Sequence, residues 1–137
     1  MIILDSDVLS EAMRANEVVA SWLDRQPRSS VWTTAITIFE IRTGLLFMPG
    51  GRRRSERETA FTHLIVDKLE NRILDFDQAA AEEAAVLMEK RRRVGRPVEA
   101  RDTMIAGIAL AQRATLATRN IRHFGDLTVS VVDPWNS

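Results

Sequence analysis

The sequence predicts an α/β fold, with one domain in which helices flank a largely parallel central sheet. Two observations predict this fold class. Short apolar or β-branched segments alternate along the chain with longer segments whose apolar residues recur at helical spacing. The 137 residues, 45% of them hydrophobic, suffice for one core, and no repeat, low-complexity tract or long linker divides them. We therefore expect a single domain over residues 1–137.

The amino-terminal half is expected to contain two strands and several helices. Residues 1–4 are apolar and lead into the turn-prone Asp5, and residues 30–34 are rich in β-branched and aromatic side chains, so both segments are predicted strands. Pro27 and the sequence Pro49-Gly50-Gly51 are expected to interrupt the helices. Apolar spacing predicts those helices over residues 8–13, 18–25, 37–48 and 55–71. In the last helix the side chains expected to face inward are Phe61, Leu64, Ile65 and Leu69.

The carboxyl-terminal half is expected to alternate strands and helices. Asp77 has the side chain of a helix cap, and Gly95 followed by Pro97 is a typical helix end, so a helix is predicted over residues 78–93. The remaining elements are a helix over residues 99–114 and strands over residues 72–76, 115–118 and 128–132.

Composition excludes several kinds of function. The chain has no cysteine, which excludes disulfides, thiolate metal sites and cysteine nucleophiles and fits a reducing cytoplasm. No apolar run reaches the ~18 residues of a membrane span, and Met1 is followed by no leader-like segment. We therefore expect a soluble, cytoplasmic protein that does not bind a membrane. The formal net charge is zero, so no global field attracts nucleic acid.

Arginine is concentrated in two clusters. The first is Arg52-Arg53-Arg54 with Arg57, and the second is Arg91-Arg92-Arg93 with Arg96. The planar guanidinium group matches phosphate, so a nucleic-acid substrate is compatible with these clusters. Solvated helix ends would explain the same pattern.

Three carboxylates occupy positions where a charge is unfavourable. Asp5 follows the first apolar strand, and ligands of parallel sheets bind beyond the carboxyl ends of the strands. Glu40 lies within a strongly apolar helical segment, and Asp102 shares a helix face with Ile105. Each side chain should therefore lie at the edge of the core. If the three meet, they repel one another unless a cation separates them. Mg²⁺ is the natural partner, because it prefers carboxylate and phosphate oxygens.

Each acid also has a purely structural interpretation. Asp5 and Asp7 are of the residue type that caps helices and forms turns. Asp102 would be favoured by the helix dipole if it lay in a first turn. Glu40 is close in sequence to Arg42 and would form an ion pair with it or with another arginine. Taken singly, none of the three acids identifies a catalytic site.

Four segments link these acids into an ordered pattern. They are residues 3–11 (ILDSDVLSE), 37–44 (TIFEIRTG), 102–109 (DTMIAGIA) and 116–124 (LATRNIRHF). In order and spacing they resemble the four motifs of PIN-domain proteins, in particular those of the VapC/FitB-like toxins. The resemblance spans nearly the whole chain.

This resemblance implies an activity and a set of partners. It implies RNA cleavage that depends on Mg²⁺, for which Mn²⁺ would substitute, and that is carried out by a metal-activated water. The catalytic residues it implies are Asp5, Glu40, Asp102 and Asn120, of which Asp5 and Asp102 would bind the metal. Ser6, Arg42 and Thr118 would contact the substrate. It further implies a homodimer and a small antitoxin with a DNA-binding part, so that DNA is contacted only through the antitoxin. Either arginine cluster would receive RNA or an antitoxin segment.

The chain departs from the family pattern at two positions. Asp7 stands where the family usually has Asn. It either adds an acid to the site or caps the following helix, and we favour the cap. Asn120 stands where many members have a fourth Asp, and its amide adds no charge. We therefore expect one tightly bound metal ion, with a second one held only together with the RNA phosphate. His123 is either a phosphate contact, a proton donor or a structural residue before Phe124, and we favour the structural role.

Two other functions fit part of the sequence. Asp5-Ser6-Asp7 also resembles the opening of haloacid-dehalogenase-like phosphatases, in which the first Asp is the nucleophile. That family also needs a lysine and a later acidic pair, but Lys68 and Lys90, the only lysines, both fall in amphipathic helices. The other alternative is a PIN-like module with weak or no catalysis that binds RNA or a protein. Asn120 is the only feature that favours it, and metal titration would distinguish it from an enzyme.

Overall fold

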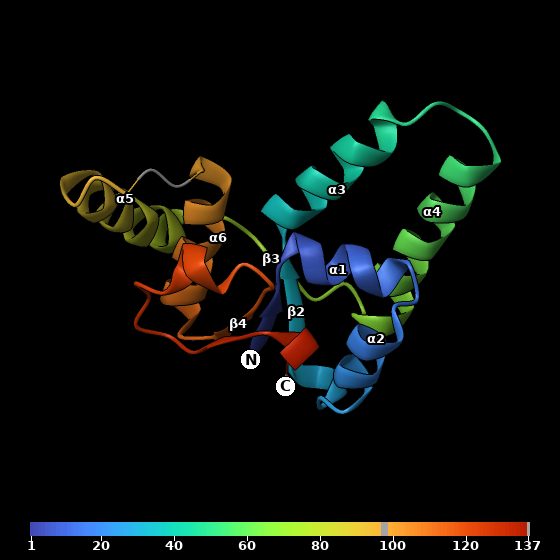
Figure 1. Ribbon diagram of the computed structural model, residues 1–137, viewed down its shortest axis with the longest axis horizontal. Coiled ribbons are helices and arrows are strands. Elements are labelled where there is room, and N and C mark those ends of the chain that lie inside the picture. The colour runs from blue at the N-terminus through green and yellow to red at the C-terminus, as the bar shows by residue number, and fades with distance from the viewer. Residues whose placement is uncertain (97–98, 137) are drawn as a thin grey trace.

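A five-stranded parallel sheet forms the centre of the molecule in the computed structural model, which describes residues 1–96 and 99–136 (Figure 1). The strand order is β3-β2-β1-β4-β5. The strands are β1 (Ile2–Leu4), β2 (Val31–Thr34), β3 (Ile73–Leu74), β4 (Thr115–Ala117) and β5 (Val131–Val132). The predicted α/β class with a parallel sheet is confirmed. Pro97, which we predicted to follow a helix end, lies outside the described residues.

Helices connect the strands on both faces of the sheet. The α-helices are α1 (Ser6–Met13), α2 (Glu17–Asp24), α3 (Ala35–Phe47), α4 (Arg52–His63), α5 (Gln78–Arg93) and α6 (Ala100–Gln112). Shorter helical turns are η1 (Arg28–Ser30), η2 (Leu64–Lys68), η3 (Ile121–Phe124) and η4 (Pro134–Asn136). Among the described residues, none of these helices is both long and apolar enough to cross a membrane.

The sheet separates two hydrophobic cores. Ile3 and Leu4 are both fully buried, and successive side chains of a strand face opposite sides of the sheet. Leu4 packs with residues of α1 to α4, whereas Ile3 packs with residues of α5 and α6. Ala117 and Leu116 of β4 divide between the same two cores. Figure 1 shows α5 and α6 on one side of the strands and α1 to α4 on the other.

The predicted helix over residues 55–71 differs from the structure at both ends. It begins earlier, at Arg52, after Gly51 with a φ of 145°. Ion pairs one turn apart, Arg52 with Glu56 at 2.9 Å and Arg54 with Glu58 at 2.7 Å, support the first turns. After His63 the chain continues as the π-helical turn η2. The predicted inward face is confirmed, since Phe61, Leu64, Ile65 and Leu69 are all buried.

The predicted strands over residues 72–76 and 128–132 are longer than the observed ones. Only residues 73–74 and 131–132 form strands there. β3 and β5 are the edges of the sheet, and each pairs with a single neighbour. An edge strand extends only over the residues that form hydrogen bonds with its single neighbouring strand, so the rest of each predicted segment is not a strand.

Gly107 allows α5 and α6 to pack closely. A Cβ at this position would lie 2.5 Å from the carbonyl oxygen of Ala80 and 2.7 Å from the Cβ of Ala84. We expect Gly107→Ala to lower the free energy of unfolding by about 1–3 kcal/mol, because the backbone of α5 must move. Urea unfolding followed by circular dichroism measures the change.

Gly44 of α3 provides the matched control for Gly107. A Cβ at Gly44 meets no atom within 4 Å among the described residues. Gly44→Ala should therefore raise the free energy of unfolding by about 0.5–1 kcal/mol, the helical advantage of alanine over glycine. Equal effects at the two positions would contradict the close approach of α5 to α6.

Candidate active site

The first part of the site lies where β1 and β4 end. These strands pair in parallel with Leu4 opposite Ala117, so the next residues, Asp5 and Thr118, lie at the same edge of the sheet. The Thr118 hydroxyl donates a hydrogen bond to Asp5 Oδ2 at 2.8 Å, and the backbone N–H of Ser6 donates to Oδ1 at 2.8 Å. Asp5 is only 3% exposed. Two donors therefore fix the orientation of a buried carboxylate.

Asp7 is a second acid beside Asp5, and our prediction that it caps the following helix is wrong. The N-cap of α1 is Asp5, and Asp7 lies within the first turn. The reason is that α1 begins at Ser6, two residues before the predicted start. Asp7 Oδ1 accepts a hydrogen bond from Val8 N at 2.7 Å, and Oδ2 accepts one from Arg119 N at 3.1 Å. Asp7 thus ties α1 to the loop that follows β4.

Glu40 and Asp102 approach the same edge from α3 and α6. Arg101 lies 4.0 Å from Glu40 Oε2, and the Ser6 side chain is close enough to lower the pKa of Glu40. Its other oxygen, Oε1, is buried and has no hydrogen-bond partner in the described part of the chain. Asp102 lies in the first turn of α6, and its Oδ2 is 3.2 Å from His123 Nδ1.

The pKa values show that these acids act on one another. Burial, followed by the charge of Asp7, raises the pKa of Asp5 to about 7, although the hydrogen bonds from Thr118 and Ser6 oppose the shift. Burial also raises the pKa of Asp7 and of Glu40, with Arg101 opposing the shift at Glu40. The charge of Asp102 contributes to all three increases. The structure therefore brings the three predicted carboxylates, Asp5, Glu40 and Asp102, into one acidic group together with Asp7.

This acidic group matches a divalent cation in its chemistry. Its carboxylate oxygens are the ligands that Mg²⁺ prefers, and a cation would offset both the burial and the repulsion that raise the pKa values. The unpartnered Oε1 of Glu40 is a free ligand atom. Nevertheless, within residues 1–96 and 99–136, no three acidic or histidine side chains are already grouped closely enough to hold a metal ion. The donor set fits the ion, and binding would require the side chains to move closer together.

Arg42 is not paired with Glu40, so that interpretation is wrong, while its predicted substrate contact stays a prediction. Its guanidinium group lies over the ring of Phe61, 4.9 Å from the centroid. Two positions along a helix correspond to about 200° of rotation, so Glu40 and Arg42 face nearly opposite directions. The basic residue next to Glu40 is Arg101, so the alternative pairing with another arginine is the one observed.

The loop after β4 places the remaining predicted residues around Asp5. Asn120 is exposed, and its backbone N–H donates to the Thr118 hydroxyl at 3.1 Å. His123 contacts Asp102, a contact that our structural interpretation of this residue missed. The available signal was its position in the fourth motif, three residues after Asn120.

The second arginine cluster is only partly exposed, although both of its interpretations, a phosphate contact and a solvated helix end, assume accessible side chains. Arg92 and Arg93 are exposed, but Arg91 is only 2% exposed and pairs with Asp126 at 2.9 Å. On α5, Arg91 continues the buried face formed by Ala84 and Leu87, at a spacing of one or two helical turns. The first cluster is accessible, with Arg52 and Arg53 exposed and Arg57 half-buried.

A groove of about 390 Å³ extends from the acidic group toward the first arginine cluster. Ser6 and Glu40 line one end, and Arg14 and Arg57 line the other. Apolar side chains cover part of its wall, namely Met13, Ile41, Leu45 and Met48. The groove thus joins an acidic end to a basic end.

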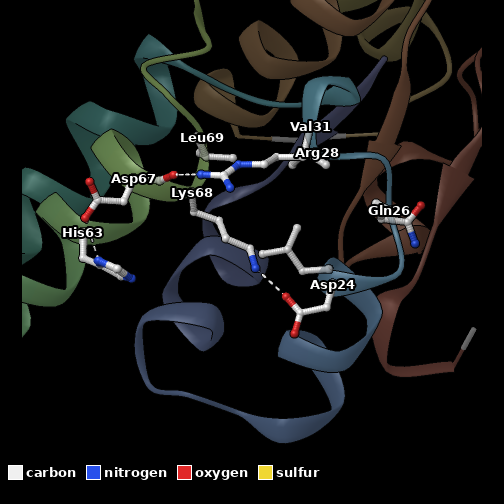
Figure 2. Close-up of a pocket in the computed structure, with 9 residues that line it drawn as sticks. Asp24, Gln26, Arg28, Val31, His63, Asp67, Lys68 and Leu69 are labelled. Atoms are coloured by element: carbon white, nitrogen blue, oxygen red, sulfur yellow. Dashed lines mark hydrogen bonds and ion pairs between the residues drawn. The ribbon is translucent and has the colours of Figure 1, made fainter.

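A separate cavity of about 370 Å³ lies at the opposite edge of the sheet, near the start of β2 at Val31 (Figure 2). Its charged groups pair with one another, as the dashed lines show: Lys68 with Asp24, and His63 with Asp67 at 2.8 Å. Lys90 is exposed on α5. Neither lysine is among the groups that act on the Asp5 carboxylate, where a haloacid-dehalogenase-like phosphatase would need one.

Comparisons with known proteins extend over the whole chain. A family model described as the PIN domain matches residues 2–128. The chain is 39% identical to the plasmid stability protein StbB of Pseudomonas syringae pv. tomato, over 100% of both chains. It is 33% identical to the VapC ribonuclease Y4jK of Sinorhizobium fredii over 98% of both, and 33% identical to the toxin FitB of Neisseria gonorrhoeae over 99% of both.

Solved structures agree with these sequence relationships. The structure of FitAcB from Neisseria gonorrhoeae superimposes with a TM-score of 0.86 at 32% identity and covers 100% of both chains. FitAB bound to an IR36 DNA fragment gives a TM-score of 0.84 at 31% identity, over 98% of this chain and 96% of that one. The chain belongs to the PIN-domain family, and within that family it groups with the VapC and FitB toxins.

Proposed function

We propose that this protein is a metal-dependent endoribonuclease and the toxin of a type II toxin–antitoxin pair. The observation that carries the proposal is the acidic group of Asp5, Asp7, Glu40 and Asp102 at the carboxyl edge of the sheet. Such a group is costly unless it binds a cation, because burial and mutual repulsion both disfavour the charged carboxylates. A 33%-identical relative that is named a ribonuclease supports the same activity.

The side chains of the site have distinct roles in this proposal. Asp5 and Asp102 bind Mg²⁺, for which Mn²⁺ substitutes, and Glu40 binds it directly or through a water. When bound, the ion would supply Lewis-acid chemistry: it would polarise a phosphate oxygen and lower the pKa of a nearby water. The Thr118 hydroxyl and the Ser6 N–H hold Asp5 in orientation.

The groove next to Glu40 is the proposed path of the RNA strand. Its basic end, Arg14 and Arg57, suits phosphate groups, and its apolar wall suits bases. Ser6 lines its acidic end, while Thr118 acts through Asp5 because its hydroxyl is buried. Asn120 is exposed beside the site and suits a contact to a water or a phosphate. A single tightly bound ion is expected, because Asn120 adds no fourth charge.

The proposed partners are a second copy of the chain and a small antitoxin with a DNA-binding part. The relative FitB is named a toxin, and FitAB has been solved bound to a DNA fragment. On this basis the protein contacts DNA only through its antitoxin, and it acts in the cytoplasm, where RNA is available. A toxin with this activity arrests growth when it is produced without its antitoxin.

The test is RNA cleavage by the purified protein, freed of any antitoxin. We expect cleavage of a structured RNA with Mg²⁺, no cleavage with excess chelator, and recovery when Mg²⁺ or Mn²⁺ is added in excess. Equal cleavage with and without chelator would refute the metal dependence. Metal-independent RNA binding without cleavage would favour a binding module instead.

A further inference from the structure

A buried arginine lies directly behind the acidic group. Arg91, in the last turn of α5, is the largest of the fully buried side chains. Its Nε donates to Asp126 Oδ2 at 2.9 Å, and its Nη2 donates to Asp126 Oδ1 at 3.0 Å. Nη2 also donates to the carbonyl oxygen of His123 at 2.7 Å, and Nη1 donates to the Thr103 hydroxyl at 2.8 Å. The guanidinium group thus bonds to three residues from two other segments.

Those two segments carry the pair of side chains that meet at the acidic group. Thr103 directly follows Asp102 in the first turn of α6, and the His123 carbonyl belongs to η3. Asp102 Oδ2 and His123 Nδ1 lie 3.2 Å apart, although they are far apart in sequence. On the buried side, Arg91 bonds to the Thr103 side chain of α6 and to the His123 backbone of η3. On the accessible side, the side chains of Asp102 and His123 meet.

The local structure also fixes Arg91 itself. α5 is followed by Gly95 with a φ of 66°, and the backbone N–H of Arg96 donates to the carbonyl oxygen of Arg91 at 2.9 Å. The Arg96 side chain donates to the carbonyl oxygen of Arg122, so a second arginine holds the same turn. Arg91 also lowers the pKa of Asp126, which keeps this carboxylate charged as the partner of the guanidinium group.

We propose that Arg91 is a positioning residue of the active site, which holds η3 against α6 so that His123 and Asp102 face each other. The term active site rests on the proposed function, whereas the positioning of His123 and Asp102 does not. A guanidinium group is needed because it bonds to a carboxylate, a carbonyl and a hydroxyl in one plane. A lysine at this position keeps the charge but has a single nitrogen, so it cannot span all three acceptors.

The test uses Arg91→Lys and the two histidines of the chain, His63 and His123. In the metal-free protein at one fixed pH, we expect the ring resonances of His123 to shift in the NMR spectrum while those of His63 stay in place. Mg²⁺ affinity, measured by calorimetry, should fall by about 10–100-fold, the usual effect of losing a supporting contact behind a metal ligand. In RNA cleavage, the fold decrease in kcat should exceed the fold increase in KM.

Arg72→Lys is the matched control. The guanidinium group of Arg72 also bonds to backbone carbonyls, with Val31 O at 2.8 Å, but it lies beside the start of β2, at the other edge of the sheet. This variant should lose stability and leave both the His123 resonances and the Mg²⁺ affinity unchanged. If Arg91→Lys and Arg72→Lys changed the His123 resonances and the Mg²⁺ affinity equally, the proposal would be overturned.

A second variant covers the case in which Arg91→Lys does not fold. Thr103→Val removes one acceptor of the guanidinium group next to Asp102 and keeps Arg91 paired with Asp126. We expect a smaller shift of the same His123 resonances and a smaller loss of Mg²⁺ affinity; unchanged values would overturn the proposal. The NMR readout needs no RNA cleavage, so it tests the positioning role even if the proposed ribonuclease activity fails.

Discussion

Replacing Asp102 with asparagine is expected to reduce RNA cleavage by about 100- to 1,000-fold while the fold is kept. Asparagine preserves the size of the side chain and an oxygen, but it removes the charge that would bind the metal ion. Asp102 is partly accessible at the start of α6, so the substitution disturbs no core packing. Its charge also raises the pKa values of Asp5, Asp7 and Glu40, and its loss should lower all three.

Single-turnover cleavage at saturating protein and Mg²⁺ separates this loss from weaker RNA binding. Asp24→Asn is the matched control, because Asp24 is an exposed acid paired with Lys68 at the opposite edge of the sheet. It should cleave at the rate of the unmodified protein. Full activity of Asp102→Asn would remove Asp102 from the proposed site.

Replacing Asp5 with asparagine is expected to make the metal-free protein more stable at pH 8, although it removes a proposed metal ligand. The pKa of Asp5 is about 7 in the folded state, whereas the ordinary value of 3.8 applies to the unfolded chain. Between these values the unfolded chain releases the proton that the folded state keeps, so rising pH favours unfolding. The stability lost between about pH 4 and pH 7 approaches an upper limit of about 4 kcal/mol. The neutral asparagine side chain has no such dependence.

Urea unfolding in excess chelator from pH 4.5 to pH 8.5 measures this effect. The unmodified protein and Asp24→Asn should lose stability as the pH rises, whereas Asp5→Asn should show a much flatter profile. Adding Mg²⁺ at pH 8 should restore stability to the unmodified protein, because the ion binds the folded state, and should not do so for Asp5→Asn. A stability that rises steadily from pH 4.5 to pH 7 in the unmodified, metal-free protein would contradict the raised pKa of Asp5.

The sequence alone determined the local structure and the chemistry of the site. Apolar spacing identified the buried face at Phe61, Leu64 and Ile65, because helix geometry repeats over a few residues. Asp5 was found because it ends an apolar strand, and in a parallel sheet such strand ends lie at one edge. Glu40 and Asp102 were found because a charge inside an apolar helical pattern is unfavourable without a partner. These inferences need only neighbouring residues and the general rules of α/β folds.

The tertiary structure alone decided which side chains meet. His123 lies against Asp102, Arg101 replaces Arg42 as the basic neighbour of Glu40, and Asp7 joins the acidic group. Arg91 belongs to a run of arginines that looks solvent-exposed, yet it is buried because Asp126 comes from a distant turn to pair with it. These contacts depend on strand order and on the rotation of each helix about its axis. Packing between segments far apart in sequence determines the strand order and the helix rotations, so a local sequence pattern cannot predict these contacts.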